Sequence, residues 1–404
     1  MSRRVLIIGG SIAGLLAGNL FHRRGWEVQV FERAPGDLEG RGAGITILPG
    51  LVEGFRAAGA EVSEESLGIL LPGRTALNRA GEVVAERVFS QAMTSWGRLY
   101  ETLRGIFPAS QYQAASTLER IEQDAHRVTA VLSDGRRVSG DLLIGADGLR
   151  STVRSQFLPQ LQPHYTGYVA WRCLTDENAL DAAKFSRLFE RYTVCVAPGE
   201  QGIGYPVPGP DHSKAPGRRQ YNVVWYHPVR APDELRRYMS DDNGRHHPNG
   251  VPPALLSKRL RDEMIEISRQ VLAPQFAEAL RHGRMHFFQP IMDIEPQKMV
   301  FGRVAIVGDA AFVTRPHVAM GVPKGAGDVL ALAKALDDNT DLEQALASFE
   351  SERMRVSRNI VARGRYLGQY MEAQLGSDVQ RQAAERARVP SQVMLETAAP
   401  FDYG

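Results

Sequence analysis

Residues 5–14 read Val-Leu-Ile-Ile-Gly-Gly-Ser-Ile-Ala-Gly, and this segment predicts the fold of the N-terminal region. Its leading apolar residues are typical of a short, buried parallel strand, and a glycine-rich turn follows directly. Apolar residues then recur at helical spacing until the chain approaches Gly25, where the helix is predicted to end. Residues 27–31 predict a second strand that closes on Glu32. The order strand, turn, helix and strand is a βαβ unit.

Such a turn suits the pyrophosphate of a dinucleotide, because a helix N-terminus stabilises negative charge when no side chain keeps the ligand at a distance. Gly9 allows the tight turn, and Gly14 allows the helix to pack closely on the strand. Ser11 stands where a middle glycine is usual. Glu32 would accept hydrogen bonds from the ribose hydroxyls of the adenosine half. This motif predicts a dinucleotide site but leaves FAD and NAD(P) open.

Two later segments each carry an acidic residue where an apolar strand ends. Residues 141–148 read Asp-Leu-Leu-Ile-Gly-Ala-Asp-Gly, which places Asp147 in a glycine turn. Residues 304–311 read Val-Ala-Ile-Val-Gly-Asp-Ala-Ala, which places Asp309 in another turn, and a helical pattern begins beyond Gly321. A carboxylate followed by a glycine-rich helix start suits a ribityl hydroxyl beside a phosphate. These segments favour FAD as the dinucleotide.

The three motifs, in this order, resemble the single-component FAD-dependent aromatic hydroxylases, the para-hydroxybenzoate hydroxylase family. The motifs are Gly9 to Gly14 with Glu32, Gly145-Ala146-Asp147-Gly148 with Ser151 and Arg154, and Gly308-Asp309-Ala310-Ala311 with Pro316 and Gly321. They span residues 9–321, so the resemblance covers most of the chain. Within the family, residues 166–172, 205–209 and 315–317 are most similar to the 2,6-dihydroxypyridine 3-monooxygenase branch.

The resemblance implies a set of flavin contacts. Glu32 would hold the adenosine ribose, Asp309 the ribityl or phosphate region, and Asp147 would lie near the cofactors. The other residues expected to contact the flavin are Gly9, Ser11, Gly14, Arg33, Arg41, Arg98, Gly308 and Gly321.

Candidates for catalysis and proton handling come from the middle of the chain and from the third motif. They are Tyr205, His227, Pro316 and His317. The family commonly carries a histidine directly after Gly-Asp-Ala-Ala, whereas this chain has Phe312 there and a histidine at 317. No role of the family's histidine is therefore transferred to this chain.

The activity implied by the resemblance is the hydroxylation of a small, electron-rich aromatic or hydroxypyridine-like ring. NAD(P)H would reduce the flavin, and O2 would react with it to give a C4a-hydroperoxide that transfers one oxygen atom. Two alternatives stay open at this point. A flavin-dependent dehydrogenase or reductase would use the same nucleotide motifs without oxygen insertion, and a non-catalytic flavin-binding regulator would bind the cofactor alone.

Composition narrows the class of protein. Lys and Arg total 48 against 46 for Asp and Glu, so a net charge of +2 argues against a nucleic-acid partner. The two cysteines have no metal-ligand or redox spacing, and no metal site is predicted. No apolar run approaches the length needed to cross a bilayer. We expect a cytoplasmic enzyme that binds a small aromatic substrate and O2. A homodimer is one assembly that the sequence allows.

The motifs predict an α/β fold with a Rossmann-like FAD-binding domain and an inserted mixed-sheet substrate domain. The FAD-binding domain would comprise residues 1–70, 96–160 and 296–375, and the substrate domain 71–95 and 161–295. Strand-like runs in 161–295 carry several aromatics, which suits a sheet over a pocket for a planar ring. Beyond a long amphipathic helix, 342–375, we expect a C-terminal tail over 376–404 that is loosely ordered from Gln380 onward.

Overall fold

The structure is a computed structural model, and it describes residues 3–38, 42–248 and 250–404. Its first sheet has the order β16-β17-β10-β1-β2-β6, and the sequence motifs predicted four of these strands, β1, β2, β10 and β17. Strands β17, β10, β1, β2 and β6 run parallel. The strands of this sheet are β1 (Arg4–Ile8), β2 (Glu27–Phe31), β6 (Tyr112–Gln113), β10 (Leu142–Gly145), β16 (Val300–Phe301) and β17 (Val304–Ile306).

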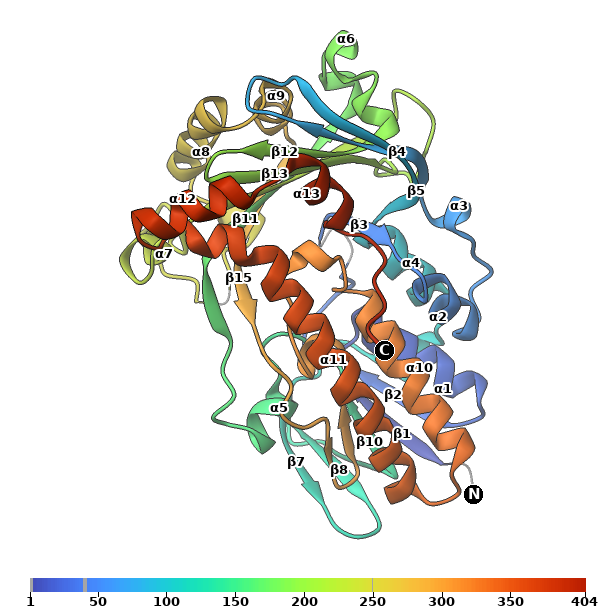
Figure 1. The fold of residues 1–404 in the computed structure, drawn as a ribbon. Coiled ribbons are helices and arrows are strands. Elements are labelled where there is room, and N and C mark those ends of the chain that lie inside the picture. The colour runs from blue at the N-terminus through green and yellow to red at the C-terminus, as the bar shows by residue number, and fades with distance from the viewer. Residues whose placement is uncertain (1–2, 39–41, 249) are drawn as a thin grey trace.

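Three helices lie side by side next to this sheet (Figure 1): α1 (Ile12–Arg23), α10 (Pro323–Asp338) and α11 (Leu342–Ala373). Each follows a motif or apolar pattern that predicted a helix, and the three predictions are confirmed. Strands β1, β10 and β17 are almost wholly buried because helices and neighbouring segments cover them, which is why they are largely apolar without alternation. Strand β2 instead alternates, with Glu27 exposed and Val28 buried.

A large mixed sheet forms the upper part of the molecule in Figure 1, in the order β15-β11-β14-β13-β12-β4-β5-β3. All neighbouring strands in it are antiparallel except β12 and β4, which are parallel. Its strands are β3 (Gly44–Ile47), β4 (Ile69–Leu77), β5 (Val83–Ser95), β11 (His164–Asp176), β12 (Arg191–Ala197), β13 (Glu200–Val207), β14 (Gln220–Pro228) and β15 (Met285–Asp293).

The two faces of the large sheet bury different apolar clusters, as period-two alternation requires. On β14, Val223 and Trp225 pack in a cluster with helices α8 (Lys258–Val271) and α9 (Pro274–Arg281). Val224 and Tyr226 belong to the cluster on the other face, which is directed toward the first sheet. The predicted α/β class with an inserted mixed sheet is confirmed.

The remaining elements connect or flank these sheets. A small antiparallel sheet holds β7 (Leu118–Gln123), β8 (Val128–Leu132) and β9 (Arg137–Gly140). The other helices are α2 (Leu51–Ala57), α3 (Glu64–Leu67), α4 (Trp96–Ile106), α5 (Thr152–Phe157), α6 (Ala182–Phe185), α7 (Asp233–Tyr238), α12 (Asp378–Ala387) and α13 (Pro390–Glu396). In the described part of the chain, none of the helices combines the length and apolar character needed to cross a membrane.

Two segments differ from the sequence-based expectation. Strand β3 lies within residues 1–70 yet joins the edge of the large sheet, because its backbone pairs with β5. The tail 376–404, expected to be loosely ordered from Gln380 onward, forms α12 and α13 and continues against the core. Met394 of α13 is fully buried, so apolar packing explains the order that the mixed composition of this segment concealed.

Candidate active site

In the turn between β1 and α1, the backbone at Gly9 lies close to the backbone at Ala146. Gly9 has a φ of 104°, and a Cβ at this position would lie 2.4 Å from the carbonyl oxygen of Ala146. A Cβ on Gly14 would lie 1.8 Å from the carbonyl oxygen of Gly9. Ser11 is the N-cap residue of α1, and its side chain makes no capping hydrogen bond. The amide groups that begin α1 are therefore left for a ligand at this turn.

Glu32 lies beside this turn at the end of β2. Its side chain is 7% exposed, and its carboxylate oxygens accept hydrogen bonds from the backbone amides of Gly10 at 2.8 Å and Ala34 at 2.9 Å. A carboxylate has about four lone-pair sites, so two backbone donors leave capacity for further donors. Glu32 thus fixes the turn and can still accept hydroxyl groups from a ligand.

Asp147 follows β10 and contacts the first turn of α5, whose N-cap residue is Ser151. One carboxylate oxygen accepts from the amides of Thr152 at 2.7 Å and Val153 at 3.2 Å. The other oxygen is buried and has no partner among the described residues. Burial raises the pKa of Asp147 above its ordinary value, because desolvation disfavours the charged form. An unpaired buried acceptor next to the glycine turn is a place where a ligand hydroxyl would be stabilised.

Arg154 joins the second motif to the third. Its side chain is 2% exposed and donates to the carbonyl oxygens of Ala310 at 2.9 Å and Asp309 at 3.2 Å. The carboxylate of Asp309 pairs with the buried ammonium of Lys324, in the first turn of α10, at 2.6 Å. The third motif is therefore held from both sides, while nearly half of the Asp309 side chain stays exposed.

A cavity of about 530 Å³ lies between the large sheet and the third motif. This volume falls in the range typical of small-molecule sites. Residues of the large sheet line one wall, and the turn and loop that follow β17 line another. The lining side chains that carry the argument below are Arg172, Tyr192, Tyr205, Tyr226 and Phe287 on the sheet, and Asp309, Pro316 and Gly321 opposite.

The sheet wall of the cavity is aromatic and carries one partly buried cation, Arg172. Arg172 donates to the carbonyl oxygen of Gly44 at 2.9 Å and lies over the ring of Phe287, while its buried Nε has no partner within the described chain. Tyr205 stacks on Tyr192 with ring centroids 5.5 Å apart. Burial raises the pKa of Tyr205 to about 12, and the Arg172 guanidinium opposes that shift. The Tyr205 hydroxyl therefore stays protonated at neutral pH.

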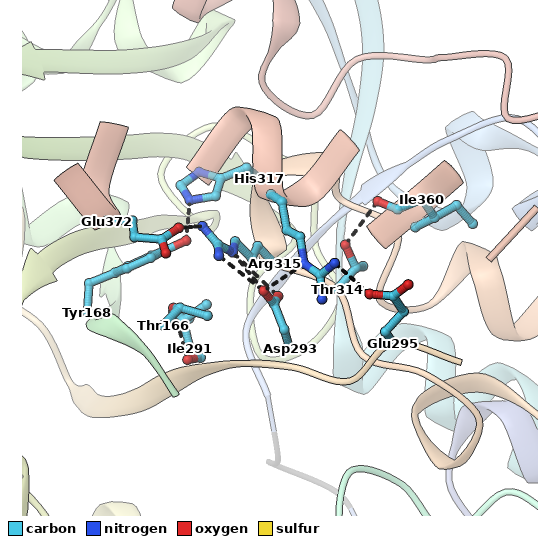
Figure 2. A network of polar contacts seen from close by, with 11 residues as sticks. Thr166, Tyr168, Ile291, Asp293, Glu295, Thr314, Arg315, His317, Ile360 and Glu372 are labelled. Atoms are coloured by element: carbon cyan, nitrogen blue, oxygen red, sulfur yellow. Dashed lines mark hydrogen bonds and ion pairs between the residues drawn. The ribbon is translucent and has the colours of Figure 1, made fainter. Parts of the chain in front are cut away.

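A buried polar network lies under the opposite wall (Figure 2). Arg315 pairs with Asp293 at 3.1 Å, and both side chains are 4% exposed. His317 is 1% exposed, and its Nε2 lies 2.9 Å from the hydroxyl of Tyr168. Burial and the charges of Arg315 and, more weakly, Arg388 lower the pKa of His317 to about 3. His317 is therefore neutral across the physiological range.

Helix α11 presses directly on this network. A Cβ on Gly364 would lie 2.3 Å from Thr314 Oγ1, and a Cβ on Gly368 would lie 2.6 Å from Arg315 Cδ. Both glycines let the helix approach the segment 314–317 more closely than any larger residue would. The loop that presents Pro316 to the cavity is thus fixed by ion pairs on one side and by a helix on the other.

Comparison with known proteins places this architecture in a family. Residues 165–293 match the family described as FAD binding domain-like, and residues 293–364 match the FAD binding domain family. The 2,6-dihydroxypyridine 3-monooxygenase of Paenarthrobacter nicotinovorans is 30% identical over 355 residues, which cover 87% of each chain. The chain belongs to the FAD-dependent aromatic hydroxylases.

Solved structures agree with this assignment. The hydroxylase superimposes on 2,6-dihydroxypyridine-3-hydroxylase from Arthrobacter nicotinovorans with a TM-score of 0.86 and 27% identity, covering 92% of this chain and 93% of that one. It superimposes on the FAD complex of a variant of HpxO from Klebsiella pneumoniae with a TM-score of 0.76 and 25% identity, covering 97% and 94%.

The residues at the nucleotide turn fit the FAD that the hydroxylase binds. Glycines 9 and 14 leave room that a Cβ would fill, the start of α1 offers amide donors, and Glu32 and Asp147 offer acceptors. We propose that these groups hold the adenosine and diphosphate part. Asp309 and Gly321, which line the cavity, are proposed to hold the part of the cofactor nearest the substrate.

The other residues predicted to contact the flavin differ in their exposure and in their contacts. Arg33 is exposed at the surface, and Arg41 lies outside the described residues. Arg98 is half-buried in the first turn of α4. Gly308 donates its amide to Asp328, a fully buried residue whose other oxygen pairs with Arg353 at 2.8 Å. The flavin contacts proposed for these residues stay predictions.

The four candidates for catalysis also differ in whether they line the cavity. Tyr205 and Pro316 line the cavity, whereas His317 lies behind Tyr226, whose ring centroid is 4.2 Å from that of the imidazole. His227 points to the opposite face of the large sheet, where its Nδ1 contacts Glu200 at 2.9 Å. A ligand in the cavity would not reach His227 across the sheet.

Sequence reasoning misses three residues of the site, namely Arg172, Lys324 and Asp328. A signal for Arg172 exists, because a charged residue in a strand-like run that is otherwise largely apolar is costly to bury without a purpose. For Lys324 the sequence offers none, since an ordinary helix lysine is solvated. Asp328 follows a glycine-rich helix start, and only the fold shows that its carboxylate turns back to the third motif.

Proposed function

We propose that the hydroxylase uses O2 and NAD(P)H to hydroxylate a small, electron-rich, hydroxylated aromatic ring, with hydroxypyridines as the preferred class. The observation that carries this proposal is the cavity wall that pairs the partly buried Arg172 with tyrosines. An apolar slot suits a planar ring, and a cation inside it suits an oxygen on that ring that bears negative charge.

The bound flavin supplies the redox chemistry, which is the transfer of electrons from NAD(P)H and the activation of O2. The chain contributes binding, orientation and exclusion of water. Arg172 stabilises the deprotonated form of a ring hydroxyl, and deprotonation makes the ring a better nucleophile. Tyr205 stays protonated, so it donates a hydrogen bond to the same oxygen and fixes the position of the ring.

The names of the relatives support the choice of ring. The Paenarthrobacter relative is named for 2,6-dihydroxypyridine, and further relatives are named for 3-hydroxybenzoate and urate. All of these names denote small rings that carry oxygen substituents. Because the two chains cover 87% of each other, we choose 2,6-dihydroxypyridine as the first compound to test.

The test supplies the purified hydroxylase with NADH or NADPH, 2,6-dihydroxypyridine and isotopically labelled O2. We expect ring-stimulated nicotinamide oxidation and one labelled oxygen atom in the product. An unoxygenated product, or oxygen that comes from water, would favour the dehydrogenase alternative. No stimulation by any hydroxypyridine or phenol would favour a flavin-binding regulator.

Arg172→Met tests the role given to the cation. We expect a rise in KM for the hydroxylated ring of about ten- to hundredfold, which corresponds to losing one charged hydrogen bond of roughly 1.5 to 3 kcal/mol. Arg284→Met is the matched control, because Arg284 is exposed and pairs with Asp176 outside the cavity. An unchanged KM in Arg172→Met would contradict the proposal.

A further inference from the structure

The C-terminal segment 390–398 packs on the large sheet and reaches the cavity at Ala398. Helix α13 packs on strands β4, β5 and β12, and the chain then turns back toward α11 (Figure 1). Met394 is fully buried and Ala398 is 4% exposed, in the same apolar cluster as Tyr205 and Tyr226 of the cavity wall. This segment is therefore part of the core around the cavity.

Arg74 on β4 holds the segment in place from the sheet side. It is fully buried, and its guanidinium donates to the carbonyl oxygens of Met394 at 2.8 Å, Thr397 at 2.7 Å and Ala398 at 2.9 Å. Its Nε donates to Gln91 at 2.8 Å. The carbonyl groups that end a helix lack partners within it, and a cation there is favourable.

The other end of the segment is attached to the loop opposite the sheet. The amide of Ala398 donates to the carbonyl oxygen of His317 at 2.7 Å, next to Pro316. Ala398 itself lines the cavity. The backbone of Ala398 is thus bound on one side to Arg74 of the sheet and on the other to His317, beyond the third motif.

We propose that segment 390–398 holds Ala398 in the wall of the ligand cavity, that Arg74 fixes the segment there, and that Ala398 limits the size of ring the cavity accepts. Arg74 is a positioning residue, because it contacts the segment and not the ligand. The limit on ring size rests on the proposed function, whereas the attachment of the segment does not.

Chemistry at the guanidinium explains why arginine is required. Its donors reach several carbonyl groups and the amide oxygen of Gln91 at once, and its plane lies over the rings of Phe89 and Tyr192 at 4.1 and 4.8 Å. Methionine fills similar space but would leave these carbonyl oxygens buried without donors, which is unfavourable. Losing the donors therefore releases the segment rather than opening a hole in the sheet.

Hydrogen–deuterium exchange of FAD-loaded protein tests the attachment without reference to activity. In Arg74→Met we expect the amides of 390–400 to exchange at least tenfold faster, while β1 and β11 keep their protection. Arg87→Met is the matched control, because Arg87 is exposed on the neighbouring strand, where its guanidinium donates to the carbonyl oxygen of Glu86 beside it. Unchanged exchange of 390–400 in Arg74→Met would overturn the proposal.

Should Arg74→Met fail to fold, Arg74→Lys provides the second measurement. A single ammonium keeps the charge but cannot donate in the fork-like geometry of a guanidinium. We expect intermediate exchange rates in 390–400 with an otherwise protected chain. Wild-type protection in Arg74→Lys would overturn the role given to the guanidinium.

Ligand size is tested at Ala398, where φ is 51° and a β-branched residue would be strained. We compare Ala398→Leu with Ala398→Gly, using 2,6-dihydroxypyridine and a ring-alkylated derivative as probes and the flavin absorbance change as the binding signal. Leucine should weaken both probes at least tenfold, and glycine should favour the alkylated ring, because each methylene changes discrimination by about 10- to 200-fold.

The outcomes separate the two ideas. Equal affinities in wild type, Ala398→Leu and Ala398→Gly would overturn the size limit while leaving the hydroxypyridine proposal intact. Binding of neither probe to the wild type would overturn the proposed substrate class and the size limit together. The exchange result would still decide whether Arg74 holds the segment.

Discussion

The guanidinium of Arg154 donates a hydrogen bond across 2.9 Å to the carbonyl oxygen of Ala310, and these residues are far apart in the sequence. This bond joins the turn after β10 to the turn after β17, so the second and third sequence motifs form one unit. Because Arg154 is 2% exposed, water cannot replace its donors.

Arg154→Met should therefore loosen both turns. We expect a loss of about 2 kcal/mol or more in the free energy of unfolding, since one buried and two partly buried carbonyl oxygens lose their donor. We also expect weaker retention of FAD. Thermal unfolding and FAD release during gel filtration would measure the two effects. Arg136→Met, at an exposed hairpin, is the control. Full FAD retention in a destabilised Arg154→Met would show that the motifs bind the cofactor independently.

Glu32→Ala should weaken FAD binding by about ten- to hundredfold, because a cofactor hydroxyl left unpaired costs about 1 to 3 kcal/mol. Glu27→Ala serves as the matched control on the same strand, where the carboxylate is exposed and pairs with Arg4 at 3.1 Å. Titration of apoprotein with FAD gives both affinities. Equal affinities would place the adenosine ribose elsewhere.

His317 should make stability depend on pH. Its pKa is lowered to about 3 in the folded chain, against about 6.5 when unfolded, so the unfolded state binds the extra proton between these values. Stability from this group is complete above pH 6.5 and is lost as the pH falls toward 3, by about 2 kcal/mol between pH 7 and 5.

Urea unfolding of wild type and His317→Gln at pH 7 and 5 measures this contribution. The fall in stability between the two values should be smaller in His317→Gln than in wild type. His126→Gln, at an exposed turn, should fall as the wild type does. Identical falls in wild type and His317→Gln would mean that His317 is protonated without cost in the folded chain.

His227→Gln should leave the KM for the aromatic ring within about twofold of wild type, because the imidazole lies on the far face of the large sheet beside Glu200. Tyr205→Phe should raise KM, since it removes the hydroxyl that is proposed to donate a hydrogen bond to the ring oxygen from the cavity wall. Steady-state nicotinamide oxidation compares the two. A larger effect at His227 than at Tyr205 would restore the role inferred for His227 from the sequence.

Sequence reasoning succeeds where a pattern is local. The strand before Gly9, the helix after it and the strand ending at Glu32 follow from apolar spacing and turn residues, and each is confirmed. The same holds for the long helix α11. A βαβ unit needs few contacts beyond its own residues, so its sequence carries the information.

The sequence does not predict which side chains of a strand line the cavity, because this depends on which face of the strand is directed toward it. Neighbours such as Tyr226 and His227 point to opposite faces, and an aromatic strand buried on both sides gives no alternation to tell them apart. The order of the tail escapes prediction for a related reason. It depends on Arg74, which lies more than three hundred residues earlier in the chain.

At Gly364 and Gly368 of α11, a substitution that stabilises the helix would disturb the loop beside the cavity. Alanine at Gly364 and Gly368 would favour an isolated helix by about 0.5 to 1 kcal/mol at each position, yet its methyl groups would collide with Thr314 and Arg315. Directed evolution that selects for heat resistance alone would favour alanine at these positions because of its higher helix propensity. It would gain a firmer helix and displace the loop that carries Pro316, so thermostabilised variants of this enzyme should be screened for ring binding at every round.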